Sequence, residues 1–151
     1  MVWKPAVTVA ALIERDGRLL FVEEKAVEGL RVLNQPAGHW EPGETLEQAC
    51  SREALEESTC VFRPRYLVGV YHWHSPAANE TYLRFAYGGD IEGFEEGRTL
   101  DEGILGTVWL TPEELRARSD ANGLRSPLVL RCMEDYLAGR RYPLGLLDYV
   151  P

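Results

Sequence analysis

The segment between residues 38 and 60, GHWEPGETLEQACSREALEESTC, gathers acidic residues around one arginine. Glu53, Glu56 and Glu57 lie within five residues of one another, Glu44 precedes them, and Arg52 stands directly before the first of the three. Carboxylates at such spacing can bind a hard divalent cation, provided that their side chains point the same way. That direction depends on the secondary structure that carries them.

An amphipathic helix is expected over residues 45–58, because Thr45 opens the pattern of a capping box. At about 100° per residue, Leu46, Ala49 and Cys50 mark an apolar stripe on this helix. The three glutamates fall with the stripe inside an arc of roughly 120°, not opposite to it. The carboxylates are therefore predicted to continue the face that is turned toward the core.

Three acids on an inward-facing surface repel one another and lose hydration, so their pKa values should rise unless a cation balances them. Oxygen ligands without Cys or His favour Mg²⁺, with Mn²⁺ as a substitute. Arg52 lies one turn before Glu56 and is placed to orient a carboxylate. The alternative is a solvated acidic helix paired with arginines, and that helix would carry its acids on the opposite face.

Apolar runs and turn signals predict a mixed fold around this helix. Arg15-Asp16-Gly17-Arg18 is typical of a hairpin turn, while Thr111-Pro112 and Ser126-Pro127 each indicate a cap followed by proline at the start of a helix. The combination indicates an α+β or α/β sandwich with a mixed sheet. Strands are expected over residues 6–13, 19–23, 30–34, 65–73, 81–91 and 104–110, a turn-rich loop over 36–43, and further helices from 112 onward and over 128–138.

Length and charge narrow the class of protein. Residues 1–151 are expected to form a single domain. With 16 basic and 24 acidic residues the net charge is −8 and no basic stripe is present, so nucleic-acid binding is not expected. No apolar run reaches the roughly 18 residues of a membrane span, and no signal-peptide pattern opens the chain, so a cytoplasmic protein is predicted. Cys50, Cys60 and Cys132 are expected to be free, mostly buried thiols.

The acidic segment resembles the Nudix box, which reads Gly, five residues, Glu, seven residues, Arg-Glu, hydrophobic, any, Glu-Glu, any, Gly, hydrophobic. Thr59 departs from the box, because the family has there the glycine that ends the helix. The resemblance implies an α/β/α sandwich with a mixed central sheet, and hydrolysis of a nucleoside diphosphate linked to some other group. The matching residues, in order, are Gly38, Glu44, Arg52, Glu53, Ala54, Glu56, Glu57 and Cys60.

The same resemblance implies a metal site. Carried over by position, Glu53, Glu56 and Glu57 would bind Mg²⁺ with help from the Gly38 carbonyl. The cation would neutralise phosphate oxygens and activate the water that attacks phosphorus. It would also bridge an acidic protein and an anionic substrate, which fits the negative net charge.

The resemblance leaves the general base open. Glu44 would support Arg52 and the loop before the helix. A glutamate of the helix, Glu53 or Glu56, or an acid on a later loop can remove the proton from water in this family. Here the later candidates are Asp101 and Glu102, of which Glu102 is favoured.

The likeness extends beyond the box. The segments KPAVTVAALI, LNQPAGHWEPGETL, YLRFAY and LRSPLV…GRRYPL are similar to the NudJ-type phosphatases of the superfamily. That subgroup acts on nucleoside di- and triphosphates and on the thiamine-precursor (hydroxymethylpyrimidine) pyrophosphate, releasing inorganic phosphate. The expected partner is therefore a small-molecule nucleoside or pyrimidine pyrophosphate, bound by a monomer or homodimer.

Substrate selection must come from residues outside the box. Trp40 and Trp73 are candidates to stack on a base or pyrimidine ring. Arg84 is placed on a strand where it can bind a phosphate bidentately, and Arg125 precedes a helix N-terminus that favours an anion. The last three have a structural alternative: core or interface packing for Trp73, an ion pair for Arg84 and simple capping at the start of the last helix.

Three other functions compete with this one. A non-catalytic Nudix-like domain that senses a nucleotide or binds a partner would be expected to lose box acids, whereas every acid is present here. A Nudix hydrolase with another nucleoside-diphosphate-linked substrate keeps the same metal site. An RNA-directed hydrolase would need a basic groove, and the sequence carries none.

Overall fold

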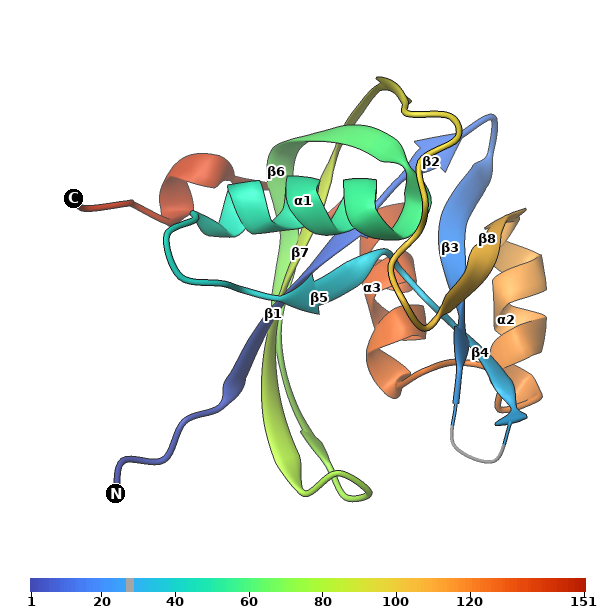
Figure 1. Ribbon diagram of the computed structural model, residues 1–151, viewed down its shortest axis with the longest axis horizontal. Helices are drawn as coiled ribbons and strands as arrows, with labels where there is room; N and C mark the ends of the chain where they lie inside the picture. Colours follow the sequence, from blue (N-terminus) through green and yellow to red (C-terminus); the bar gives the residue numbers. More distant parts are fainter. Residues whose placement is uncertain (27–28) are drawn as a thin grey trace.

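Strand β1 (Ala6–Leu12) lies parallel to β7 (Glu80–Phe94) at the centre of a five-stranded mixed sheet. The computed structural model describes residues 1–26 and 29–151 (Figure 1). The strand order is β5 (Ala37–His39), β1, β7, β6 (Cys60–Ser75) and β9 (Tyr142–Pro143), and every pair other than β1–β7 is antiparallel. A mixed sheet is therefore confirmed.

A second sheet is organised around β3 (Arg18–Lys25), which pairs with β8 (Ile104–Leu110) along most of its length. The opposite edge of β3 pairs first with β2 (Glu14–Arg15) and then with β4 (Arg31–Asn34). The predicted hairpin turn lies between β2 and β3, where Asp16 and Gly17 both have positive φ, of 53° and 77°. Positive φ at both central residues is the geometry of the tight hairpin turn that the sequence indicated.

Two helices cover opposite faces of the five-stranded sheet (Figure 1). Helix α1 (Leu46–Ser58) packs with Val9 and Ala11 of β1, while α3 (Pro127–Leu137) packs with Leu12 of the same strand. Because successive residues of a strand point to opposite faces, a strand buried on both sides reads as a continuous apolar run, as β1 does. The α/β/α sandwich is thereby confirmed.

The remaining elements complete the second sheet and the chain end. Helix α2 (Pro112–Asp120) follows β8, and Leu115 buries its side chain in the same cluster as α3. Thr111 caps α2 and Ser126 caps α3, as predicted from the proline that follows each. After α3 come β9 and a 3-10 helix, η2 (Leu144–Leu146). No helix in the described part of the chain is long and apolar enough to cross a membrane.

Some boundaries differ from the expectation. The loop expected over 36–43 contains β5, in which Gly38 pairs with Val9 of β1. Strands β6 and β7 are each longer than predicted, because their hairpin continues past the glycines and bulges that interrupt the sequence pattern. Helix α1 has the predicted capping box, in which Thr45 and Gln48 bond reciprocally. The three cysteines are free and buried, as expected.

Thr59 ends α1 in the left-handed conformation, with φ of 62° and ψ of 1°. Its backbone N–H donates to the Leu55 carbonyl oxygen at 3.0 Å, and its own carbonyl oxygen accepts from Glu95 N–H at 2.9 Å. The helix therefore ends as a glycine would end it, although a β-branched residue carries the cost of that conformation.

Thr59→Gly is expected to raise the free energy of unfolding by about 1 kcal/mol, because it removes the strain of a Cβ at positive φ. For a chain of this size the melting temperature should rise by roughly 2–4 °C in differential scanning calorimetry. Thr59→Ala is the matched control: it keeps the Cβ and should show no such gain. Equal melting temperatures for the glycine and alanine variants would show that the Cβ of Thr59 causes no such strain.

Candidate functional site

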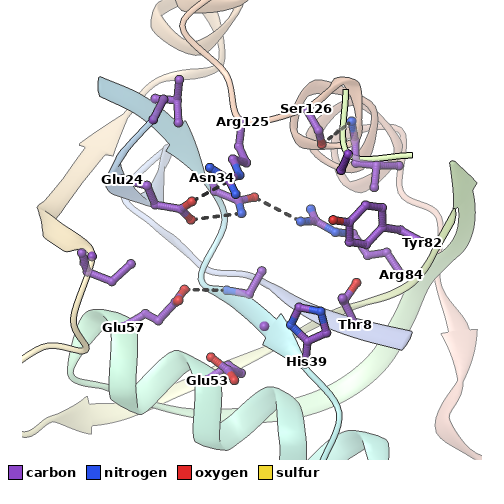
Figure 2. A pocket seen from close by; sticks show the side chains of 18 of the residues that line it. Thr8, Glu24, Asn34, His39, Glu53, Glu57, Tyr82, Arg84, Arg125 and Ser126 are labelled. Atoms are coloured by element: carbon purple, nitrogen blue, oxygen red, sulfur yellow. Dashed lines mark hydrogen bonds and ion pairs between the residues drawn. The ribbon is translucent and has the colours of Figure 1, made fainter. Parts of the chain in front are cut away.

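A cavity of about 1000 Å³ lies between α1 and β5 on one side and β4 and the start of α3 on the other. Figure 2 shows Glu53 and Glu57 reaching into it from α1, with Arg84, Arg125 and Ser126 on the opposite side. The loop before β8 adds Asp101 and Glu102 to its wall. The cavity therefore has an acidic end and a basic end.

The acidic end contains three converging carboxylates. Ligand oxygens of Glu53, Glu56 and Asp101 all lie within 4.8 Å of one another. Asp101 comes from a loop distant in sequence, and its backbone N–H donates to the Glu56 carbonyl oxygen at 3.0 Å. This bond brings the loop against the last turn of α1 and adds a third carboxylate to the group.

Arg52 connects these acids to the loop before α1. Its guanidinium donates to both carboxylate oxygens of Glu44, at 2.9 and 2.7 Å, and to the His39 carbonyl oxygen at 3.0 Å. It also donates to Glu53 at 2.7 Å and Glu56 at 3.2 Å. The predicted pairing of Arg52 with Glu44 is confirmed. The bidentate bond also lowers the pKa of Glu44, so this carboxylate holds Arg52 in place.

Gly38 allows α1 to approach β5. A Cβ added to Gly38 would overlap the carboxylate of Glu53, so a larger residue there would displace this side chain. The residue before it, Ala37, donates its backbone N–H to a Glu57 carboxylate oxygen at 2.9 Å. Strand β5 therefore fixes the positions of two of the three helix carboxylates.

Burial acts strongly on the protonation of two of these acids. Burial raises the pKa of Glu53 to about 7, although the adjacent Arg52 lowers it. Burial raises the pKa of Glu57 to about 8, against the hydrogen bond from Ala37. The rise predicted for crowded, inward-facing carboxylates is confirmed for these two residues.

This donor set fits a hard divalent cation. Its side-chain ligand atoms are all carboxylate oxygens, which Mg²⁺ and Mn²⁺ prefer. Glu53, Glu56 and Asp101 form the tightest group, while Glu57 lies beside it with one oxygen bonded to Ala37. Glu102 is exposed on the cavity wall and is not a member of this group.

The basic end contains Arg84, which is only 6% exposed. Its Nη1 donates to Gln35 Oε1 at 3.0 Å and its Nη2 donates to Asn34 Oδ1 at 3.1 Å. Arg125 is half exposed and lies 3.7 Å from a carboxylate oxygen of Glu24. The structural alternative for Arg84, an ion pair, is absent among the described residues.

Aromatic residues are distributed unevenly around the cavity. Trp73 stacks on Tyr82, with ring centroids 5.8 Å apart, and both line the cavity. Trp40 is 48% exposed, its Nε1 donates to the Glu44 carbonyl oxygen at 2.8 Å, and it is not among the lining residues. The structure thus brings Trp73 to the cavity and leaves Trp40 at the outer surface of the loop.

Sequence reasoning missed several residues that shape this site, chiefly Glu24, Asn34, Gln35 and Tyr82. Asn34 and Gln35 stand at the end of an expected strand. Two consecutive amides at that point could have indicated a polar wall of the site. Glu24 lines the cavity near the end of β3, where the register with β8 shifts and the extra residue, Leu105, lies in β8. Residues 19–22 before it are all buried, so the sequence shows no alternation that would assign the Glu24 side chain to one face.

Comparisons with known proteins agree with this geometry. The family model described as NUDIX domain matches residues 2–131. The chain is 36% identical to phosphatase NudJ of Escherichia coli strain K12 over 145 residues, covering 96% of this chain and 92% of that protein.

Solved structures agree as well. A NUDIX hydrolase from Nitrosomonas europaea superimposes with a TM-score of 0.93 at 50% identity, covering 97% of this chain and 98% of the other. The E. coli ORF135 protein does so with a TM-score of 0.73 at 25% identity, covering 91% of each chain.

The raised pKa values predict how the metal-free protein responds to pH. In the folded protein the pKa values of Glu53 and Glu57 are about 7 and 8, above the ordinary value of 4.5 for a glutamate. Both residues therefore bind protons more tightly in the folded protein than in the unfolded chain. Between pH 5 and 8 the folded state therefore holds more protons than the unfolded chain, so these groups lower the unfolding free energy as pH rises.

Differential scanning fluorimetry in EDTA from pH 5 to 8.5 would measure this effect. Glu57→Gln is the matched control, because an amide oxygen can still accept from Ala37 while the titrating proton is gone. The melting temperature of the wild type relative to this variant should fall as pH rises. A difference that stays constant across the range would contradict the raised pKa of Glu57.

Proposed function

This chain belongs to the Nudix hydrolase family, and on that premise we propose that it hydrolyses phosphoanhydride bonds with Mg²⁺. The proposed substrates are nucleoside di- and triphosphates and the thiamine-precursor pyrimidine pyrophosphate, bound as small molecules in the cavity. A cytoplasmic monomer or homodimer of a single domain, residues 1–151, is part of the proposal.

One observation carries the proposal: the carboxylate oxygens of Glu53, Glu56 and Asp101 converge within 4.8 Å at one end of a cavity of about 1000 Å³. Glu53, Glu56 and Glu57, with the Gly38 carbonyl and Asp101, are the residues that would hold the cation. When bound, a divalent cation neutralises phosphate oxygens and makes a water more acidic.

The other residues orient these groups and accept the proton. Arg52 keeps Glu53 and Glu56 in place through its bonds to both, while Glu44 holds Arg52. The attacking water gives its proton to a carboxylate, a role typically worth about 10²- to 10⁴-fold in rate. Glu102 on the cavity wall is the proposed acceptor, with Glu53 or Glu56 as the alternative.

The rest of the substrate is proposed to occupy the opposite end of the cavity. The stacked pair of Trp73 and Tyr82 offers an aromatic surface to a base or pyrimidine ring. Arg84 and Arg125 supply the positive charge there that the acidic end lacks. A substrate that is aromatic at one end and anionic at the other suits this distribution.

Phosphate and pyrophosphate release should require Mg²⁺ or Mn²⁺ and stop in excess EDTA. A screen over nucleoside di- and triphosphates, the pyrimidine pyrophosphate, dinucleoside polyphosphates and nucleotide sugars would rank the substrates. Release that continues undiminished in EDTA would refute the metal-dependent mechanism. No release from any of these compounds with Mg²⁺ would favour the non-catalytic, nucleotide-sensing alternative.

Two neighbouring variants separate metal binding from proton transfer. Asp101→Asn removes a carboxylate of the converging group, so it should raise the Mg²⁺ concentration for half-maximal rate as well as lower the rate. Glu102→Gln should lower the rate by about 10²-fold or more without changing that concentration. If Glu102→Gln turned over substrate at the wild-type rate, Glu102 would not be the general base, and Glu53 or Glu56 of α1 would take that role.

A further inference from the structure

Arg84 carries a buried positive charge that pairs with no carboxylate in the described part of the chain. The residue is 6% exposed and lines the cavity, and its Nε has no hydrogen-bond partner. Among residues 1–26 and 29–151 no carboxylate lies within ion-pair distance of it. A buried charge without a counter-ion is costly, and an anionic ligand would offset that cost.

The acceptors that hold Arg84 are neutral, and their own orientation is fixed. Asn34 Nδ2 donates to a Glu24 carboxylate oxygen at 3.2 Å, so the amide oxygen of Asn34 is left facing Arg84. Gln35 Nε2 donates to the Val129 carbonyl oxygen at 2.8 Å, so its amide oxygen also faces Arg84. These two amides set the plane of the guanidinium without cancelling its charge.

The other candidate counter-ions near Arg84 do not serve it. Burial raises the pKa of the adjacent Cys132, so this residue stays a neutral thiol. The buried carboxylate of Asp135 accepts from Tyr71 at 2.8 Å and lies 3.3 Å from Arg131 and 3.7 Å from Arg140. Cys132 is therefore uncharged, and Asp135 already interacts with other residues.

Arg84 also has donors left over. A guanidinium has five N–H groups, and the bonds to Asn34 and Gln35 use two of them. Figure 2 shows Arg84 between Asn34 and Tyr82, across the cavity from Glu53 and Glu57. A planar fork with free donors matches the oxygens of a phosphate group.

The chain places this fork within reach of the acidic end. Gln35 bonds Arg84, and Ala37, two residues later, bonds Glu57. Arg84, Glu53 and Glu57 line the same cavity, so a substrate with two linked phosphate groups can contact both ends.

We propose that Arg84 is an anion-binding residue for a phosphate group of the substrate other than the one attacked, and that Asn34 and Gln35 are its positioning residues. This proposal rests on the proposed function, since both groups belong to one substrate.

Binding without metal tests this proposal separately from the hydrolysis. Calorimetric titration of pyrophosphate into the wild type in EDTA should show saturable binding, weakened about tenfold or more by Arg84→Gln. Arg84→Lys should be intermediate, because it keeps the charge and loses the fork. Arg65→Gln is the matched control: it removes an exposed arginine of β6, outside the cavity, that pairs with Asp90.

Gln35→Met tests the positioning role. It removes the acceptor at 3.0 Å from Arg84 and keeps a side chain of similar length. With Mg²⁺ and a nucleoside diphosphate, KM should rise several-fold while kcat changes little. A general structural defect would instead lower kcat and the melting temperature together, and that outcome would overturn the role of Gln35.

The other outcomes are equally decisive. Pyrophosphate binding in EDTA that is the same in wild type and both Arg84 variants would overturn the proposal. So would Arg84-dependent binding of a nucleoside without phosphate, because Arg84 would then read the base. Should hydrolysis fail with every substrate while Arg84-dependent pyrophosphate binding is present, the proposed function falls and the anion site remains.

Discussion

Helix α1 lies so close to β5 that the Glu53 carboxylate fills the space where a side chain at position 38 would stand. At the same contact the Ala37 N–H lies 2.9 Å from a Glu57 carboxylate oxygen, so two acids of the helix are held against β5. Arg52 offsets part of the resulting repulsion through Glu44, Glu53 and Glu56. The acidic end of the cavity therefore depends on three features: the small Gly38, the guanidinium of Arg52 and the C-terminal turns of α1.

The two ends of the cavity present opposite electrostatic problems. Carboxylates crowd at the acidic end, and burial raises the pKa values of Glu53 and Glu57. At the other end lies the buried guanidinium of Arg84, whose hydrogen-bond partners among residues 1–26 and 29–151 are two amide oxygens. A cation at the acidic end would offset the repulsion of the carboxylates, and an oxyanion at the other end would offset the buried charge of Arg84. The electrostatic cost of each end in the folded protein would therefore favour binding of these ligands.

Much of this arrangement was predictable, because it depends on local patterns. The capping box at Thr45 and the helical period placed the acids on the inner face, and the apolar run over residues 6–13 indicated the strand that is β1. Asp101, Asn34 and Gln35 reach the site through tertiary contacts between segments far apart in the chain. No periodic pattern in the sequence indicates that Asp101 approaches α1 or that two amides hold Arg84.

The link between Asp101 and α1 has one more consequence. The loop is fastened by its backbone N–H to the Glu56 carbonyl oxygen, and a backbone bond does not depend on which side chain follows it. Any residue other than proline at position 101 can keep the loop in place. Position and chemistry are therefore separable at residue 101: the backbone bond holds the loop, and the side chain adds a carboxylate beside Glu53 and Glu56.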